Sequence, residues 1–191
     1  MLTPTIVTSA TELEQVAALS NQNLAANVSD SEKDSDGFVT WAYTLPILQQ
    51  LHEIAPSVIV KDGDVVAGYA LVLPVAAAPI YPPLQEVLAY FKRIDYKGKA
   101  LFDYRFYVMG QVCVHPNYRG QGVFDMLYAH HRRLYTGQYD FVITEIATRN
   151  QRSQRAHARV GFETIHTYHD QLDEWNVVVL AFNLSAPVPK I

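Results

Sequence analysis

The pattern of apolar and polar positions along the chain predicts several helices. Ser9 and Glu12 have the spacing of a capping box, and apolar residues at roughly helical spacing follow them. We therefore expect a first helix from about residue 10 to residue 26. The same pattern predicts helices around residues 45–54 and 84–93.

Runs of β-branched and apolar residues predict strands between these helices. Residues 57–61 and 65–73 are two such runs, and the Asp62-Gly63-Asp64 turn between them is typical of a hairpin. Further strand-like runs follow at residues 104–114, 141–147 and 175–184. The irregular stretch from 74 to 103 is expected to be an insertion over the sheet.

Composition favours one soluble domain over residues 1–191. The 191-residue chain is 49% hydrophobic and 18% charged, and its formal net charge of -4 gives no basic field for nucleic acid. No apolar stretch has the length of a membrane span, and no membrane association is expected. The one cysteine, Cys113, cannot form an internal disulfide and lies in an apolar run, so we expect an inert buried thiol in a reducing cytoplasm.

A glycine-rich turn after the strand at 104–114 is the most informative segment. Arg119, Gly120 and Gly122 follow Pro116 and lead into a segment with helical periodicity. Glycines at a helix N-terminus expose backbone N–H groups at the positive end of the helix dipole, which suits a phosphate or pyrophosphate. The alternative is an ordinary tight connection with a surface arginine.

This segment resembles the coenzyme-binding motif of the GNAT superfamily of N-acetyltransferases. That motif reads Arg or Gln, two free positions, Gly, one free position, then Gly or Ala, and here Arg119 and Gly122 match while Phe124 replaces the small last residue. The resemblance implies that acetyl-CoA is the co-substrate and that no metal is needed. Its pyrophosphate is expected to lie against Arg119, Gly120, Gln121, Gly122, Val123 and Phe124.

A second segment resembles a later motif of the same family, in which an Asn precedes a short helix ending in Gly-Phe. Asn150 and Gly161-Phe162 match it. The resemblance implies that Asn150 and Ser153 lie near the pantetheine arm of the coenzyme. His157 stands where the family has a Tyr that acts as general acid, so it is the candidate donor of a proton to the leaving sulfur; the alternative is a surface histidine.

The resemblance also implies a fold of the α/β (α+β) class. We expect a mixed central sheet of six to seven strands with helices on both faces. The strand at 110–114 is expected to splay from the strand at 141–147. Backbone groups of Val112, Cys113 and Val114 would then pair with the pantetheine amides, and the acetyl group would lie in the gap.

Several side chains near this gap are candidates for chemistry. Glu145 shares a strand face with core positions, so a raised pKa would suit a general base for the amine; the alternative is a structural partner for an arginine between 149 and 159. Gln111 and Tyr107 could position the acceptor, although strand packing explains both. His115 could relay a proton, although it more simply caps a strand end.

The predicted function is direct transfer of an acetyl group from acetyl-CoA to a small-molecule or peptide amine, catalysed by Glu145 and His157. A longer acyl group or a non-amine acceptor is one alternative, and a coenzyme A-binding or regulatory module without turnover is another. Pairing of the last strands across subunits would give a homodimer. The acidic run of Asp30, Glu32, Asp34 and Asp36 reads as a solvated loop or, in a sharper interpretation, as a wall for a cationic acceptor.

Overall fold

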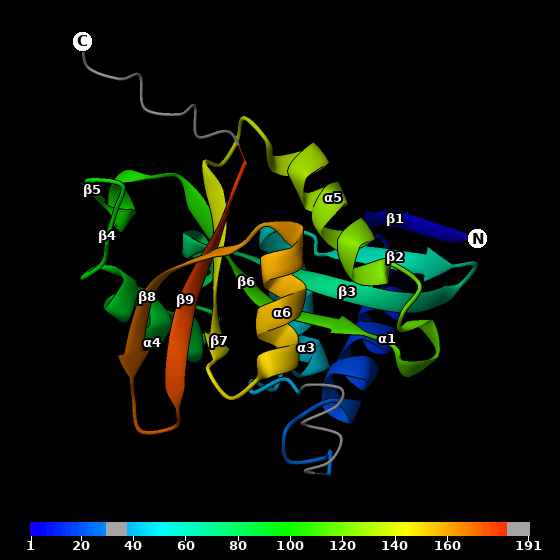
Figure 1. The fold of residues 1–191 in the computed structure, drawn as a ribbon. Coiled ribbons are helices and arrows are strands. Elements are labelled where there is room, and N and C mark those ends of the chain that lie inside the picture. Colours follow the sequence, from blue (N-terminus) through cyan, green and yellow to red (C-terminus); the bar gives the residue numbers. More distant parts are fainter. Residues whose placement is uncertain (30–37, 183–191) are drawn as a thin grey trace.

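The computed structural model describes residues 1–29 and 38–182, and within these a mixed sheet of seven strands forms the centre of the molecule (Figure 1). The strand order is β1-β2-β3-β6-β7-β9-β8. These strands are β1 (Leu2–Ile6), β2 (Val58–Asp62), β3 (Val65–Pro74), β6 (Phe106–Val114), β7 (Phe141–Ala147), β8 (Glu163–His169) and β9 (Glu174–Ala181). The short strands β4 (Asp95–Tyr96) and β5 (Lys99–Ala100) pair with each other.

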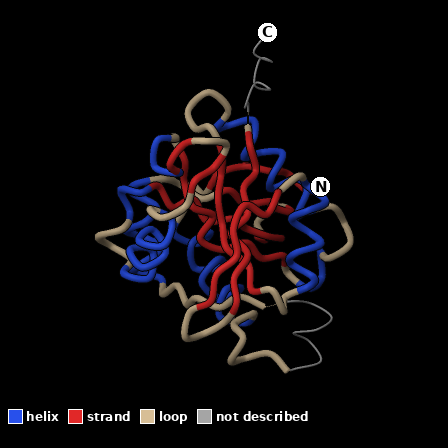
Figure 2. The backbone as a smooth tube through the Cα atoms, turned by 60° about the vertical axis from the view of Figure 1, so that its left-hand side comes forward, coloured by secondary structure: helices blue, strands red, loops and turns tan. Residues whose placement is uncertain are grey.

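Helices cover both faces of this sheet, and Figure 2 shows the strands as a middle layer between them. The described helices are α1 (Ala10–Gln22), α3 (Leu45–Ile54), α4 (Pro82–Phe91), α5 (Val123–Tyr135) and α6 (Gln151–Val160), with short 3-10 turns at Val75–Ala77, Leu101–Asp103 and Pro116–Tyr118. None of the helices in the described residues is long and apolar enough to cross a membrane. The expected fold class, with its mixed sheet and helices on both faces, is confirmed.

Two apolar cores explain this layering. Leu13 of α1, Leu48 of α3 and Leu88 of α4 pack in one core against one face of the sheet. Leu127 and Tyr128 of α5 pack in the other core against the opposite face, where α5 and α6 lie in Figure 1. Because both faces are covered, the central strands are apolar at nearly every position, and each residue of β3 from 66 to 73 is buried.

The hairpin predicted from Asp62-Gly63-Asp64 is present. Strands β2 and β3 pair antiparallel from Asp62 opposite Val65 onward, and Gly63 adopts a left-handed conformation with φ of 59°. The capping box at the start of α1 is also present, because Glu12 N–H donates to the Ser9 hydroxyl and the Ser9 N–H donates to the Glu12 carboxylate.

Several elements differ from expectation. The first helix stops at Gln22 rather than near residue 26, because Asn23 caps it and the Asn23 side-chain amide donates to the Leu19 carbonyl. Helix α4 begins at Pro82 rather than at residue 84, and strand β9 ends at Ala181 rather than at residue 184. Strands β1 and β8 were not expected, since both are edge strands. The acidic run from Asp30 to Asp36 lies outside the described residues.

Candidate functional site

The site begins where strands β6 and β7 separate. Their parallel pairing covers only Phe106 opposite Phe141 through Val108 opposite Ile143. Next to this last pair, the Thr144 hydroxyl donates a hydrogen bond of 2.9 Å to the Met109 carbonyl. Beyond Met109 the two strands share no ladder pair, so the predicted splay of residues 110–114 from β7 is confirmed.

A large cavity of about 740 Å³ lies at the end of β6, which we call the turn cavity. Its walls come from β6, the glycine turn, the first turn of α5 and one side of α6, together with Asn23, Phe38 and Val39. Of the predicted coenzyme residues, the turn cavity is lined by Val112, Cys113, Val114, Arg119, Gly120, Gly122, Val123, Phe124, Asn150 and Ser153. Gln121 does not line it, because its side chain is turned to the Asn117 carbonyl, to which its Nε2 donates at 2.9 Å.

The glycine turn has the geometry of an anion-binding loop. Gly120 and Gly122 have φ of 75° and 78°, in the left-handed region that disfavours other residues. Gly122 is the N-cap of α5, so the first N–H groups of this 13-residue helix begin at the turn. A Cβ added to either glycine would have no atom within 4 Å, which means that it would extend into open space. The turn therefore leaves room for a ligand against the backbone.

Arginines supply positive charge around this cavity. Arg119 lines the turn and donates from Nη2 to the Asn23 side-chain oxygen at 3.0 Å, which fixes the guanidinium over the cavity. Arg152, Arg155 and Arg159 line it from α6. The dipole of α5 and these side chains favour an anionic ligand.

Phe124, the residue that departs from the family pattern, packs mainly toward the interior. Its ring contacts the rings of Tyr128, at a centroid distance of 5.0 Å, and His157, at 5.1 Å. The Phe124 side chain thus packs against the core beneath α5, while its backbone lies at the N-terminus of this helix.

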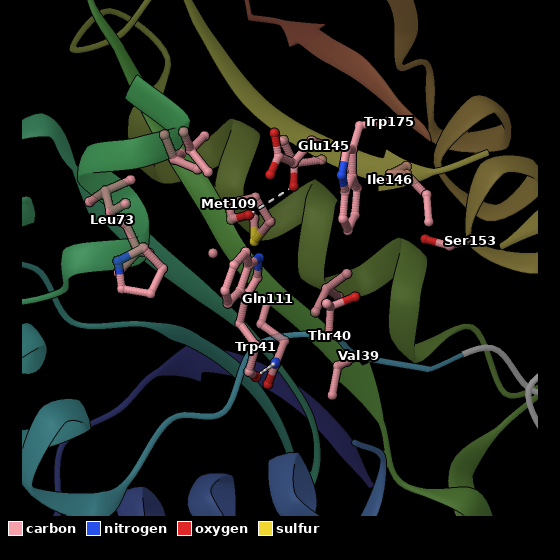
Figure 3. Close-up of a pocket in the computed structure, with 18 of the residues that line it drawn as sticks. Val39, Thr40, Trp41, Leu73, Met109, Gln111, Glu145, Ile146, Ser153 and Trp175 are labelled. Carbon is pink, nitrogen blue, oxygen red and sulfur yellow. Dashed lines mark hydrogen bonds between the residues drawn. The ribbon is translucent and has the colours of Figure 1, made fainter. Parts of the chain in front are cut away.

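A second cavity of about 100 Å³ lies on the other side of the gap between the strands, and we call it the aromatic cavity (Figure 3). Ring-bearing and aliphatic side chains form most of its wall: Phe38, Val39, Trp41, Tyr43, Leu73, Tyr81, Pro83, Leu84, Val87, Val108, Met109, Val112, Ile146 and Trp175. The two cavities meet, because Phe38, Val39, Val112, Asn150 and Ser153 line both.

Glu145 is the acidic side chain of the aromatic cavity, and Figure 3 shows it beside Trp175. Burial raises its pKa from 4.5 to about 7, although a hydrogen bond of 2.6 Å from the Tyr168 hydroxyl to Oε2 opposes this change. Tyr168 is in turn stacked on Tyr90 at 4.5 Å. The carboxyl group is therefore held at a fixed place and titrates close to neutral pH.

The arginine partner considered for Glu145 is wrong, since its partner is a tyrosine. Arg149 instead donates to the Asp173 carboxylate at 2.5 Å, and Arg159 pairs with Asp125 at 2.7 Å. Glu145 therefore lacks the kind of cation that would hold its pKa low.

His157 is a buried residue at the junction of the two cavities rather than a surface histidine. Its side chain lines the aromatic cavity, and the residue is 3% exposed. Nδ1 lies 2.8 Å from the Ser153 carbonyl, which can only accept, so Nδ1 carries the hydrogen and Nε2 accepts from the Tyr128 hydroxyl at 2.9 Å. Burial lowers the pKa of His157 to about 4, so the ring is neutral at pH 7.

The strand residues Gln111 and Tyr107 both have structural partners. Gln111 accepts hydrogen bonds from the hydroxyls of Ser20 and Tyr69 and donates to the Trp41 carbonyl at 2.6 Å. Tyr107 is fully buried and hydrogen-bonded to His131, on the face of the sheet that α5 covers. Gln111 thus fixes the segment that contains Trp41, one wall of the aromatic cavity.

Cys113 and His115 behave as ordinary structural residues. Cys113 is buried, as expected, and burial raises the pKa of its thiol to about 12, which favours the unreactive protonated form. The His115 Nδ1 accepts from the Asn117 N–H at 3.2 Å and caps the short turn after β6. It is absent from the lining of both cavities in the described residues.

Sequence reasoning missed Tyr168, Trp175 and Trp41 as site residues. Tyr168 lies on β8, whose residues are mostly exposed and so show no clear alternation. Trp175 opposes Ala147 across the β7–β9 ladder, which brings it beside the strand of Glu145. The only sequence signal for these residues is that large aromatic side chains gather in binding sites.

Comparisons with known proteins agree with this geometry. Residues 26–162 match the acetyltransferase (GNAT) family, whereas a search of curated proteins gives no match. Among solved structures, the ribosomal-protein-S18-alanine N-acetyltransferase of Escherichia coli is similar at a TM-score of 0.62 and 12% identity, covering 100% of both chains. YncA, a putative acetyltransferase of Salmonella typhimurium solved with acetyl-CoA, is similar at a TM-score of 0.61 and 15% identity, covering 99% of both chains.

A GNAT family acetyltransferase of Streptococcus agalactiae is similar at a TM-score of 0.64 and 13% identity, covering 94% of this chain and 95% of its own. At such identities these structures establish the shared fold. The match over residues 26–162 spans more than half of the chain and includes the glycine turn and α6. The chain therefore belongs to the acetyltransferase (GNAT) family and is an N-acetyltransferase.

Proposed function

We propose that the turn cavity binds acetyl-CoA, that the aromatic cavity binds the acceptor amine, and that the acetyl group passes directly between them. The observation that carries this proposal is the meeting of the two cavities where β6 and β7 separate, with Glu145 on one side and the glycine turn on the other. The Cys113 thiol is buried and protonated at neutral pH, so it takes no part as a nucleophile in this direct transfer.

The turn cavity suits coenzyme A in shape and charge. Backbone N–H groups from Gly120 to Phe124 would hold the pyrophosphate, with Arg119 and Arg155 adding positive charge. The backbone of residues 112–114, which is free of β7, would pair with the pantetheine amides, and Asn150 and Ser153 would contact the arm. When bound, acetyl-CoA supplies the activated acetyl group as a thioester.

Glu145 would accept the proton that the acceptor must lose before its nitrogen can attack. A pKa of about 7 means that a large share of Glu145 is ionised at neutral pH and yet basic enough to take a proton. Since Tyr168 donates to Oε2, we assign Oε1 to the amine. Placing the amine beside the thioester supplies most of the remaining advantage through proximity.

The proton-donor role expected of His157 would need the imidazolium form. With a pKa of about 4, only about one ring in a thousand carries the second proton at pH 7. We therefore propose that neutral His157 is a positioning residue. It holds the Ser153 carbonyl and the Tyr128 hydroxyl, and thus the first turns of α6, against the junction of the cavities.

A matched pair of glycine variants tests the coenzyme site. Gly122→Ala places a Cβ in the open space of the turn, whereas Gly137→Ala introduces a Cβ at a similar φ of 87° after the C-terminus of α5. We expect calorimetry to give micromolar binding of acetyl-CoA, about 8 kcal/mol, to the wild type and to Gly137→Ala. Binding to Gly122→Ala and to Arg119→Ala should weaken at least about 10-fold.

The result that would contradict the proposal is equal binding by Gly122→Ala and Gly137→Ala, or no binding to the wild type. Loss of binding in both glycine variants would also count against it, because it would trace the effect to backbone strain. Circular dichroism of each variant at the assay temperature checks that the fold is retained.

We also propose a cytoplasmic location and a homodimer. The buried free thiol of Cys113 fits a reducing compartment. Strand β8 is the last strand of the sheet and its outward side chains are exposed, so a second copy could pair along it. Sedimentation of the purified protein would give a mass of two chains if this pairing forms, and of one chain if it does not.

A further inference from the structure

The aromatic cavity has a composition that restricts the acceptor. The two tryptophans of the chain, Trp41 and Trp175, both line it, and Tyr43 is stacked on Tyr81 at 4.6 Å in the same wall. Figure 3 shows Trp41 and Trp175 among the residues that line the cavity, with Trp175 beside Glu145. Such a wall favours an apolar body over a polar one.

Most of the polar side chains in this wall are already hydrogen-bonded within the protein. The Gln111 amide bonds to Ser20, Tyr69 and Trp41, and the Thr144 hydroxyl donates to the Met109 carbonyl. The Asn150 side chain donates to the Phe38 carbonyl and accepts from the Ser153 N–H. His157 likewise has a partner on each ring nitrogen. Among the described residues, the Glu145 oxygens are therefore the only charged group of the wall left to a ligand, beside the Trp175 Nε1–H, which has no hydrogen-bond partner there, and the exposed Thr40 hydroxyl.

The charge that the described residues give to the wall of the aromatic cavity is negative. No lysine or arginine of the described residues lines the aromatic cavity, and Glu145 is its one acidic side chain. The sequence of residues 30–37, which the structure does not describe, holds four acidic residues and one lysine, so it would not reverse the sign. A carboxylate or phosphate on the acceptor would then be buried near a carboxylate and without a cation, which is strongly unfavourable.

The size of the cavity limits the part of the acceptor that it can enclose. At about 100 Å³ it is smaller than the roughly 150 Å³ cavity that holds one benzene molecule in a protein core. The body that enters it is therefore about one ring or a short alkyl chain, with the amine directed toward the strand gap.

On the basis of the proposed function, we infer that the acceptor is a small monoamine with an apolar body of about one ring and without a carboxylate or phosphate group. The ammonium group meets Glu145, and the body fills the space between Trp41, Trp175 and the Tyr43–Tyr81 pair. The same wall disfavours free amino acids because of their carboxylate, and diamines because their second ammonium group would lie against apolar side chains. Longer peptides are disfavoured by the small size of the cavity.

Intrinsic fluorescence tests this inference without any need for turnover. Because both tryptophans of the chain line the aromatic cavity, their emission reports its occupancy directly. The protein, saturated with coenzyme A, is titrated with phenethylamine and with phenylalanine, which differ only by the carboxylate. Pentylamine and 1,5-diaminopentane form a second pair, and a tripeptide amide with N-terminal phenylalanine forms a third arm.

We expect phenethylamine to bind at least about 100-fold more tightly than phenylalanine, and pentylamine more tightly than the diamine. Equal or tighter binding of phenylalanine, of the diamine or of the tripeptide overturns the inference. The same is true if none of the amines changes the emission. Calorimetry with acetyl-CoA distinguishes failure of the proposed function from failure of this inference. If the wild type does not bind acetyl-CoA, the proposed function is refuted. If it binds acetyl-CoA but prefers a polar acceptor, only the apolar monoamine is refuted.

A gain of function supplies an independent check. Thr40 is exposed and lines the aromatic cavity, so Thr40→Arg adds a cation at its rim with little risk to folding. We expect this variant to narrow the preference for phenethylamine over phenylalanine about 10-fold or more, while Thr40→Gln, of similar length but uncharged, keeps it. An unchanged preference in Thr40→Arg contradicts the charge argument.

Discussion

Replacing Glu145 by glutamine should stabilise the protein and inactivate it. The folded state holds the pKa of Glu145 at about 7, whereas an exposed glutamate has 4.5. Below pH 4.5 the side chain is protonated in both the folded and the unfolded state, so it costs nothing. Between pH 4.5 and 7 the unfolded chain ionises first, and the free energy of unfolding falls. Above pH 7 the whole cost is present.

The magnitude follows from the two pKa values. Their difference corresponds to up to about 3 kcal/mol of lost stability above pH 7. Glutamine keeps an oxygen for the Tyr168 hydroxyl but carries no charge, so Glu145→Gln should unfold at a temperature up to about 6 to 12 °C higher than the wild type at pH 8. At pH 4.5 the two proteins should have nearly equal stability.

Activity should move in the opposite direction. Loss of the general base should lower the rate of acetyl transfer at pH 8 by about 10²- to 10⁴-fold, measured as release of the coenzyme A thiol. The pH profile of kcat in the wild type should rise with an inflection near 7, and this inflection should be absent from the variant.

Glu163→Gln is a matched control. Glu163 also accepts a hydrogen bond from a tyrosine, Tyr96, but its pKa is lowered, mainly by that hydrogen bond. Its replacement should therefore give no gain of stability at pH 8. The difference in stability between Glu145→Gln and the wild type should be larger at pH 8 than at pH 4.5. An equal difference at the two pH values would refute the claim that burial of the charged Glu145 carboxylate destabilises the folded protein. Activity within threefold of the wild type would refute its role as base.

Three further outcomes follow from the same structure. Tyr168→Phe removes the hydrogen bond that lowers the pKa of Glu145, so the inflection in kcat should move upward in pH by about one unit; an unchanged profile would contradict this. Cys113 should react with a thiol reagent only when the protein unfolds, and labelling of the folded protein would show that it is accessible. His157 has a folded pKa of about 4 and an ordinary value of 6.5, so wild-type stability should fall as the pH drops from 6.5 to 4. His157→Gln should flatten that fall in acid denaturation curves, and an equally steep fall would contradict the neutral buried ring.

The glycine turn and the helices were predictable because local sequence determines them. The helix Leu45–Ile54 and the strand Phe141–Ala147 have the predicted bounds, since each combines a clear apolar period with a nearby breaker or turn. The turn at Gly120 and Gly122 could be predicted because positive φ restricts the residue type.

Strands β1 and β8 were not predictable in this way. Both lie at the edges of the sheet, where a strand need not bury an alternating face; β1 contains Pro4, and the residues of β8 are mostly exposed. Their places depend on pairing with partners that the local sequence does not encode.

The candidate site likewise combines features that local sequence predicts with features that depend on strand pairing. Most residues that line the turn cavity could be grouped from the sequence, because those from Val112 to Phe124 follow one another in the chain. The setting of Glu145 was not, because Tyr168 reaches it from β8, which pairs with β9 next to β7, and Tyr90 supports Tyr168 from α4. Only the assembled sheet brings these residues together.

The separation of β6 and β7 has a mechanical consequence. Within the described residues, three ladder pairs and the Thr144 hydroxyl join β6 to β7 toward the Phe106 end, and no ladder pair joins the two strands toward the Val114 end. A ligand that pairs with the backbone of residues 110–114 takes the place of the β7 partner that these residues lack. Occupancy of the site should therefore slow amide hydrogen exchange along both β6 and β7, making the co-substrate a temporary part of the sheet.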